Sequence, residues 1–334
     1  MSLIHVQNLV KEYKTYDRRE GISGAVLDLF FRDYKTLRAV DDISFDIERG
    51  EMVGYIGANG AGKSTTIKVL CGILYPTAGE VIVDGRSPFQ ERETHVRNIG
   101  AVFGQRSQLW WDLAAGESLH LLSKIYGLSE KQYQQRMEEF EQVLKVKEFL
   151  KTPARKLSLG QKMRCELAAS LIHNPSIIFL DEPTIGLDVT VKQSIRDFVR
   201  RINKERGVTV ILTTHDLRDI EELCSRVLII DKGKKVFDGT LEALRMKAAD
   251  SAQLTFSMVH ALEKDWRPDG LPGSGVLWKA DGAALTAILG RQAPPRTEVI
   301  RAVLDRYGQD VQDIDIAEPQ IEHVVQQIYA SGTA

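Results

Sequence analysis

A glycine-rich segment that leads into a lysine constrains this chain more than any other feature. Residues 54–70 read GYIGANGAGKSTTIKVL. Four positions fit the spacing G-x-x-x-x-G-K-[ST] of a phosphate-binding loop: Gly57, Gly62, Lys63 and Ser64. The apolar residues 52–56 before the loop predict a buried strand, and residues 64–70 predict a helix. Because the motif needs this strand–loop–helix context, the segment predicts a nucleoside triphosphate site rather than a loose surface loop.

The residue types explain how such a loop binds phosphate. Glycines let backbone N–H groups turn inward, because no Cβ stands in the way. These groups and the N-terminus of the next helix form a nest for phosphate oxygens. Lys63 is expected to reach the β- and γ-phosphates, and Ser64 to offer its hydroxyl to Mg²⁺. The residues expected to contact the nucleotide here are Gly57, Asn59, Gly60, Ala61, Gly62, Lys63, Ser64 and Thr65.

Composition limits the other classes of protein that the chain could belong to. Its 334 residues leave room for one large domain and a smaller one. A net charge of −2 gives no reason to expect nucleic acid or an acidic membrane as the main partner. Three widely spaced cysteines favour a reduced, cytosolic protein. No apolar run approaches the 18 residues of a membrane span and no signal peptide is apparent, so a second chain would have to form any membrane passage.

The order of predicted elements indicates an α/β fold. Alternating residues 3–9 and 43–47 predict strands with one wet face, and the apolar runs 177–180 and 208–212 predict buried strands of a parallel sheet. Further strands are expected at 80–83, 226–231 and 235–238, and helices over 105–156 and 159–173. Strands alternating with helices favour a parallel-sheet core.

Two regions differ from this core. Residues 241–334 contain short elements between glycine- and proline-rich loops, and they predict a small α+β accessory domain. Residues 14–38 form an insert between the first two strands. Its apolar cluster over 24–34 predicts a short amphipathic helix.

Polar groups at the ends of other predicted strands are expected to meet the bound phosphates. Asp181 and Glu182 follow one apolar run, and His215 follows the next. Ligands of open α/β sheets lie at the carboxyl ends of parallel strands, so these groups should converge. Asp181 can hold Mg²⁺ and Glu182 can accept a proton from an attacking water. His215 can contact the γ-phosphate, and the amide of Gln105 can touch Mg²⁺ or its water.

A second anion site is predicted where the segment LSLGQ starts a helix. Ser158 is a good N-cap residue, and Gly160 and Gln161 lie in the first turn. One nucleotide does not need two such sites from one chain. The segment is therefore expected to cover a nucleotide that is bound by a second copy.

Taken in order, these motifs resemble those of the ATP-binding subunit of an ABC transporter. Residues 1–240 carry the phosphate loop GANGAGKS, Gln105, LSLGQ, the run IIFLDEP, the segment IGLD and His215. The resemblance implies a RecA-like parallel-sheet core, an antiparallel β subdomain and a helical subdomain at about 105–165. It also implies a head-to-tail dimer with two ATP molecules, each between one phosphate loop and the partner's Ser158 and Gly160. Glu182 would be the general base and Asp188 would couple the two sites.

The resemblance further implies ATP and Mg²⁺ as cofactors and one or two integral membrane permeases as partners. It places the chain at the cytoplasmic face of the inner or plasma membrane, paired with a second ATP-binding subunit. A homodimer is the favoured form of this pair, and a heterodimer is the alternative. The chain's motifs are similar to those of export-branch members, including multidrug or viologen exporters, and Trp110 and Trp111 would lie where the permease docks. Similar inserts in polysaccharide exporters imply permease contact for residues 24–34, while packing on its own domain remains the alternative.

Two departures from the family pattern are expected to matter little. The signature usually reads LSGGQ, and Leu159 replaces its first glycine here, but Gly160 is kept, so the γ-phosphate contact is expected to survive. Ile185 replaces a smaller residue in the IGLD segment, at a position expected to face the partner, and little loss is expected. An aromatic side chain near the first strand stacks on adenine in this family, and both Tyr13 and Tyr34 are candidates, with Tyr13 favoured because the strand is expected to end there. The alternative function is a soluble ABC ATPase without a permease.

Overall fold

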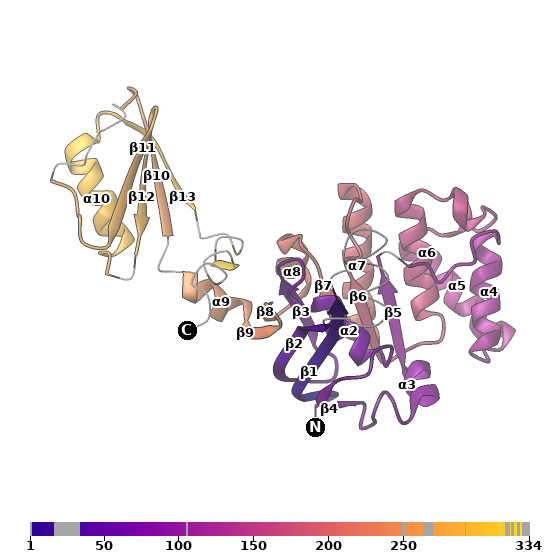
Figure 1. Cartoon of the computed structure of the whole chain (residues 1–334). Helices are drawn as coiled ribbons and strands as arrows, with labels where there is room; N and C mark the ends of the chain where they lie inside the picture. Colours follow the sequence, from indigo (N-terminus) through magenta and orange to yellow (C-terminus); the bar gives the residue numbers. More distant parts are fainter. Residues whose placement is uncertain are drawn as a thin grey trace, which may run out of the picture. The chain divides into compact units, whose positions relative to one another are not determined.

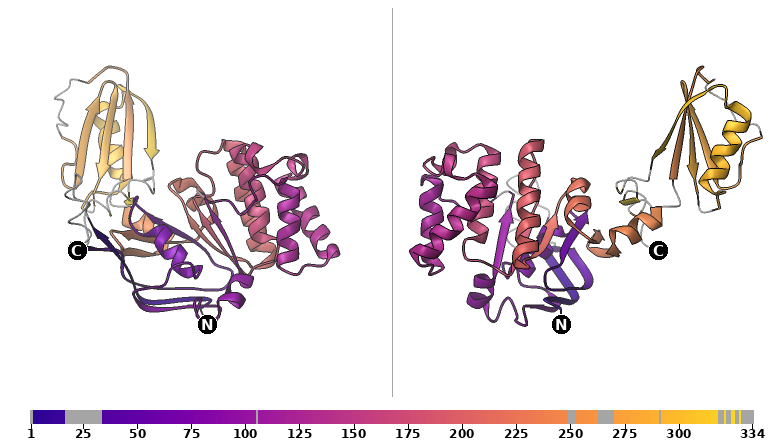
Figure 2. Two further views of the ribbon diagram at one scale, coloured as in Figure 1. Left: turned by 45° about the vertical axis from the view of Figure 1, so that its right-hand side comes forward. Right: turned by 180° about the vertical axis from the view of Figure 1, so that it is seen from behind.

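The computed structural model describes residues 2–16, 34–104, 106–248, 252–262, 270–290, 292–317, 321, 324, 325 and 328. The chain divides into two compact units, residues 1–238 and 239–334. Figure 1 labels the elements of both units, and Figure 2 shows them from two further directions. Within the described residues, no helix has both the length and the apolar character that a membrane crossing requires.

A six-stranded sheet forms the centre of the first unit. Its strand order is β5-β6-β7-β3-β8-β9. The strands are β3 (Met52–Gly57), β5 (Ile99–Phe103), β6 (Ile177–Asp181), β7 (Thr209–Thr213), β8 (Arg226–Asp231) and β9 (Lys234–Thr240). The neighbours from β5 to β8 are parallel. Parallel strands are covered on both faces, which is why β6 and β7 are continuous apolar runs. The predicted α/β core is confirmed.

Helices return the chain between these parallel strands. Helix α2 (Lys63–Leu70) follows β3, α7 (Val189–Arg206) follows β6, and α8 (Leu217–Leu223) follows β7. A short helix α3 (Arg92–Asn98) precedes the edge strand β5. The carboxyl ends of β3, β6 and β7 therefore meet the start of α2 at one edge of the sheet.

An antiparallel sheet of order β2-β1-β4 packs into the same core. Strand β1 (Ile4–Tyr16) pairs with β4 (Ala78–Val83) only as far as Val10, but it pairs with β2 (Tyr34–Ile47) along its whole length. The expectation that the first strand ends at Tyr13 is wrong, since the ladder continues to the pair Tyr16 and Tyr34. Tyr34 was expected in a helix and instead begins β2. The rest of the expected helix, residues 24–33, lies outside the described residues.

The helical subdomain contains α4 (Ala115–Ile125), α5 (Glu130–Leu144), two short 3₁₀ turns (Lys147–Phe149 and Ala154–Lys156) and α6 (Leu159–Leu171). The buried ring of Phe140 on α5 meets Phe198 on α7 edge to face, at 6.2 Å between centroids. The helical prediction is wrong for residues 106–114, which form no helix. The buried carboxylate of Glu166 on α6 accepts hydrogen bonds from the Ser107 hydroxyl and the Gln108 N–H, and these contacts hold the segment out of helical conformation.

The second unit is an α+β structure. Helix α9 (Leu241–Ala248) precedes an antiparallel sheet of order β11-β12-β10-β13. The strands are β10 (Ala252–Met258), β11 (Val276–Asp281), β12 (Ala284–Leu289) and β13 (Val311–Ala317). Helix α10 (Arg296–Tyr307) buries Val299 and Val303 against Leu254, Phe256 and Leu285 of the sheet. This unit therefore has its own hydrophobic core.

Candidate functional site

The phosphate loop connects β3 to α2 in a conformation that requires glycine. Gly60 and Gly62 have φ values of 81° and 106°, in the left-handed region that side chains disfavour. A Cβ on Gly62 would collide with the carbonyl oxygen of Ala39. A Cβ on Gly57 would lie 2.6 Å from the carbonyl oxygen of Ile230. Both positions are thus closed to any other residue without a shift of the backbone.

Lys63 points back into this loop. Its side chain is 6% exposed, and Nζ donates to the carbonyl oxygens of Gly57 at 2.7 Å and Ala58 at 3.2 Å. Burial lowers the pKa of Lys63, and the negative charges of Glu182 and Asp181 oppose that shift. The ammonium is therefore held at the loop and can interact with the phosphates of a nucleotide.

Ser64 and Asp181 bring two oxygen donors together. The Ser64 hydroxyl donates to Oδ1 of Asp181 at 3.3 Å, and the Thr213 hydroxyl donates to the same oxygen at 2.6 Å. Hydroxyl and carboxylate oxygens are the donors that Mg²⁺ prefers, so the pair fits this ion. Among the described side chains, no cluster of three or more His, Cys, Asp or Glu residues could hold a metal alone. Mg²⁺ usually takes one or two carboxylates and completes its shell with water and substrate phosphates, so it needs no further protein ligand than such a pair.

Glu182 and His215 lie beside this pair. Nε2 of His215 is 2.6 Å from Oε1 of Glu182. The backbone of Glu182 is left-handed, with φ of 56°, and its N–H donates to the carbonyl oxygen of Thr213 at 3.0 Å. Such a backbone costs about 1–3 kcal/mol and persists only where surrounding structure holds it. The turn directs the carboxylate toward the end of β7 and so toward His215.

Ser64, Asp181, Glu182 and His215 line one cavity of about 880 Å³, whereas Lys63 is not part of its wall. Its lining residues are Tyr13, Asn59, Ser64, Lys68, Ile73, Leu74, Phe103, Gly104, Arg106, Asp181, Glu182, Ile185 and His215. Of the two tyrosines, Tyr13 lines the cavity. Tyr34 contacts the ring of Tyr16 instead, with 5.9 Å between centroids, at the far end of the β1–β2 hairpin. Gln105 lies outside the described residues.

Sequence reasoning missed several residues of the cavity wall. Lys68 lies one turn beyond Ser64 on α2, and Arg106 follows Gln105 directly, so proximity to predicted residues was an available signal for both. Ile73 and Leu74 come from the turns after α2, and their apolar type alone gives no sign of a site.

The segment LSLGQ lies elsewhere. Ser158 begins α6 as predicted, and its hydroxyl accepts from the N–H of Gln161 at 3.3 Å, while Oε1 of Gln161 accepts from the N–H of Ser158 at 3.0 Å. Asp188 caps α7 in a similar way, accepting from the N–H of Val191 at 2.9 Å. Ser158, Gly160, Gln161 and Asp188 are absent from the cavity wall. Within one chain, the two predicted anion sites do not meet.

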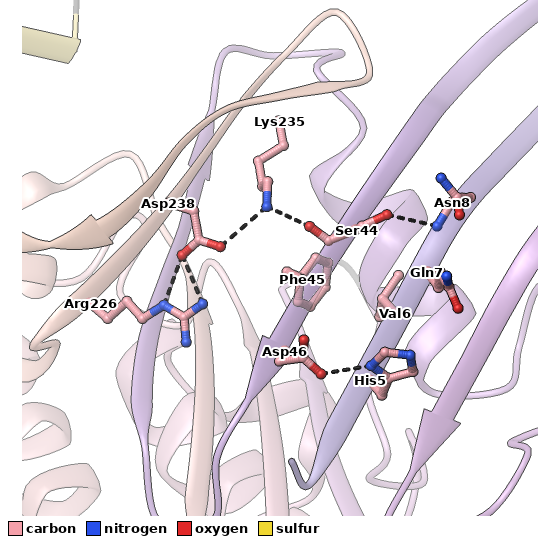
Figure 3. A pocket seen from close by; sticks show the side chains of 10 residues that line it. All are labelled: His5, Val6, Gln7, Asn8, Ser44, Phe45, Asp46, Arg226, Lys235 and Asp238. Carbon is pink, nitrogen blue, oxygen red and sulfur yellow. Dashed lines mark hydrogen bonds and ion pairs between the residues drawn. The ribbon is translucent and has the colours of Figure 1, made fainter. Parts of the chain in front are cut away.

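A second hollow, of about 500 Å³, lies between the antiparallel sheet and the strands β8 and β9 (Figure 3). Its charged groups are paired with one another. His5 binds Asp46 at 2.7 Å, and Asp238 binds Arg226 at 2.8 Å and Lys235 at 3.3 Å. Its lining includes no residue of the phosphate loop and none of Asp181, Glu182 and His215, so it is not the candidate site.

A phosphate loop and acidic groups at neighbouring strand ends define a P-loop nucleoside triphosphatase. Comparisons with known proteins narrow the class. The family profile described as "ABC transporter" matches residues 40–185. The chain is 32% identical over 210 residues to the ABC transporter ATP-binding protein NatA of Bacillus subtilis (strain 168), a match covering 63% of this chain and 85% of NatA. It is 36% identical over 233 residues to YbhF of Escherichia coli (strain K12), a probable multidrug ABC transporter ATP-binding protein, covering 68% of this chain but only 39% of YbhF.

Solved structures agree. An ATP-binding subunit of an ABC transporter aligns with a TM-score of 0.62 at 27% identity, covering 74% of this chain and 94% of that one. The dimeric ATP-binding cassette MJ0796 bound to ADP and Pi aligns with a TM-score of 0.60 at 26% identity, covering 71% and 98%. The chain belongs to the ABC transporter family, as an ATP-binding subunit. As in ABC cassettes generally, its activity is ATP hydrolysis.

Proposed function

We propose that this chain is the ATP-hydrolysing motor of an exporter whose membrane passage is formed by separate permease subunits. The observation that carries the proposal is the convergence of Ser64, Asp181, Glu182 and His215 on one cavity beside the phosphate loop. The matched relatives include ATP-binding proteins named for transport, NatA and YbhF. In this proposal the chain drives export through separate permeases, and it is located at the cytoplasmic face of the membrane.

Each residue around the cavity has a distinct task in the proposed reaction. Backbone N–H groups of the loop and the ammonium of Lys63 bind the phosphates, and Tyr13 stacks on the adenine. Ser64 and Asp181 would hold Mg²⁺, with the Gln105 amide as a further ligand, and the bound ion would neutralise charge on the phosphates. Glu182 accepts a proton from water as the water oxygen bonds to the γ-phosphorus. The bond from that phosphorus to the β–γ bridging oxygen breaks, and ADP and phosphate leave. His215 donates a hydrogen bond to the γ-phosphate.

A second copy of the chain completes the site. Ser158, Gly160 and Asp188 are outside the cavity of their own chain, and in a head-to-tail pair they would cover the nucleotide of the partner. The related cassette MJ0796 was solved as a dimer, which supports this arrangement. Leu159 and Ile185, half exposed at 50% and 55%, would lie in that interface.

The surface after Gln105 is the proposed permease contact. Trp110 and Trp111 are 39% and 66% exposed, and Leu113 is 36% exposed in the same non-helical segment. Exposed aromatic residues in one patch are typical of protein interfaces. CbiO1 of Clostridium perfringens, similar in structure at a TM-score of 0.59 and 25% identity, is described as part of the ABC transporter complex CbiONQ, which supports an assembly with other transporter subunits here.

Affinity purification tests the proposal. The tagged chain is purified from membranes solubilised in mild detergent, and co-purifying proteins are identified by mass spectrometry. Multi-spanning proteins in near-equal amounts are the expected result. Recovery of the chain without a membrane protein would favour a soluble ABC ATPase, and the hydrolytic chemistry would still stand.

A further inference from the structure

A charged cluster is buried beneath Glu182 and His215. Asp219 on α8 is fully buried, and Arg196 on α7 is 6% exposed. Nε of Arg196 donates to Oδ1 of Asp219 at 2.6 Å, and its Nη1 donates to Oε1 of Glu222 at 2.7 Å. The guanidinium therefore fixes one oxygen of Asp219.

The other oxygen of Asp219 binds two threonines. Oδ2 accepts from the Thr184 hydroxyl at 2.5 Å and from the Thr214 hydroxyl at 3.1 Å. Both threonines are buried, at 3% and 4% exposed. Thr184 is two residues after Glu182, and Thr214 directly precedes His215. One carboxylate thus joins the two segments that carry Glu182 and His215.

The segment around His215 is held from its other side as well. The Thr214 hydroxyl accepts from the N–H of Asp216 at 3.0 Å, and Oδ2 of Asp216 accepts from Nζ of Lys192 at 2.7 Å. Lys192 and Arg196 are one turn apart on α7, so this single helix supports the segment at two points.

A buried ion pair is a poor way to gain stability, because desolvating both charges costs about as much as their attraction returns. Apolar residues of similar volume would hold α7 against α8 equally well. What they would not supply is a carboxylate that accepts from both threonines at once. The left-handed backbone of Glu182 also needs such support from its surroundings.

We propose that Asp219 and Arg196 are positioning residues that set the geometry between Glu182 and His215. Neither side chain lines the nucleotide cavity, so they act through Thr184 and Thr214. The inference rests on the proposed roles of Glu182 and His215. It assigns no contact with nucleotide to Asp219 or Arg196.

Substitutions in the threonines give the sharpest test, because they keep the ion pair. Thr184→Val and Thr214→Val each remove one hydroxyl at nearly constant shape. Displacement of a reacting group by about 1 Å can cost roughly 100-fold in rate. We therefore expect each variant to lower kcat for ATP hydrolysis by roughly 10- to 100-fold, with KM for ATP changed by less than about 2-fold, as expected when ground-state binding is untouched. Asp219→Asn, which faces Arg196 with an amide, should do the same if it folds.

Thr209→Val is the matched control. Thr209 is a fully buried threonine at the amino end of β7, and its hydroxyl accepts from the N–H of Gly50 at 2.7 Å. Thr209→Val should lower thermal stability by about as much as Thr184→Val and Thr214→Val do, and it should leave kcat unchanged. The proposal is overturned if Thr184→Val and Thr214→Val keep kcat, or if their kcat falls only in proportion to the folded fraction. Glu182→Gln is measured in parallel. If Glu182→Gln hydrolyses ATP normally, the proposed role of Glu182 is wrong. If Glu182→Gln is inactive while the threonine variants keep their kcat, only the positioning role of Asp219 and Arg196 is wrong.

Discussion

Nε2 of His215 lies 2.6 Å from Oε1 of Glu182, and the two side chains come from the carboxyl ends of adjacent parallel strands, β6 and β7. Direct contact between the two means that neither can move toward a bound nucleotide without changing the other's hydrogen bond. The pair therefore behaves as one unit whose orientation depends on the strand ends. Predictions about hydrolysis follow from that dependence.

Glu182→Gln is expected to separate binding from hydrolysis. The amide cannot accept a proton from water, so kcat should fall by about 100- to 10,000-fold, the usual contribution of a positioned base. Lys63 and the phosphate loop are unchanged, so ATP affinity should remain within a few-fold. Phosphate release and equilibrium binding of a fluorescent ATP analogue measure the two quantities, and size-exclusion chromatography with ATP should show an accumulated dimer. Normal turnover by this variant would remove Glu182 from the reaction.

Gly62→Ala is expected to disable the phosphate loop. The new Cβ would meet the Ala39 carbonyl oxygen and sit on a backbone at φ of 106°. Gly127→Ala is the matched control, because Gly127 is also left-handed, at φ of 76°, but has open space around its Cβ position. In the control, the free energy of unfolding should fall only by the cost of the left-handed backbone, about 1–2 kcal/mol. In Gly62→Ala it should fall by more, and the variant should also bind ATP weakly. Urea unfolding and ATP titration compare the two, and equal behaviour would contradict the crowding argument.

Trp111→Ser should weaken the proposed permease contact and leave the ATPase folded. The side chain is 66% exposed, so its removal should change the free energy of unfolding by less than about 0.5 kcal/mol. Leu277→Ser, on an exposed apolar residue of the second unit, serves as the control. We expect less permease to co-purify with Trp111→Ser than with Leu277→Ser. Equal recovery would place the contact elsewhere.

His173 should make the protein less stable in acid. Its Nε2 donates to the carbonyl oxygen of Ile99 at 2.9 Å, its ring stacks on Tyr126, and burial lowers its pKa to about 4. Between pH 6.5 and 4 the unfolded chain binds a proton at this position that the folded chain does not. The free energy of unfolding should therefore fall by up to about 3 kcal/mol as the pH drops through that window.

His173→Gln keeps a donor for Ile99 and should remove this part of the pH dependence. His120→Gln, at an exposed histidine of α4, is the control. Urea unfolding between pH 7.5 and 4 gives the comparison. Parallel pH curves for the wild type and His173→Gln would exclude His173 as the cause.

Local patterns in the sequence were sufficient to predict the phosphate loop and the parallel core. The apolar runs before Asp181 and His215 predicted two buried strands. The carboxyl ends of parallel strands lie at one edge of a sheet, so the two residues could be expected to lie close together. The β1–β2 hairpin arms were not predictable in this way. Their pairing joins Tyr16 to Tyr34 across 17 intervening residues, whose apolar cluster suggested a helix.

Contacts between distant residues account for the other misses. The non-helical segment before α4 depends on Glu166, which is almost 60 residues further along the chain. Arg196 on α7 and Asp219 on α8, which are proposed to position Glu182 and His215, bind each other between two helices. Neither residue belongs to a recognisable motif. Such contacts become visible only once the strands and helices are placed.

Glu166 also connects two surfaces that have proposed roles, the segment before the exposed tryptophans and the amino end of α6. It belongs to α6, the helix that Ser158 begins, and its carboxylate holds Ser107 and Gln108, just ahead of the exposed Trp110. Burial raises the pKa of this carboxyl, and its ionised form depends on those donors. If the tryptophan segment were pulled away alone, a buried acid would lose its partners, which is costly. A displacement of the tryptophan segment that keeps these hydrogen bonds would therefore have to move α6 with it, and with it the proposed nucleotide contact at Ser158.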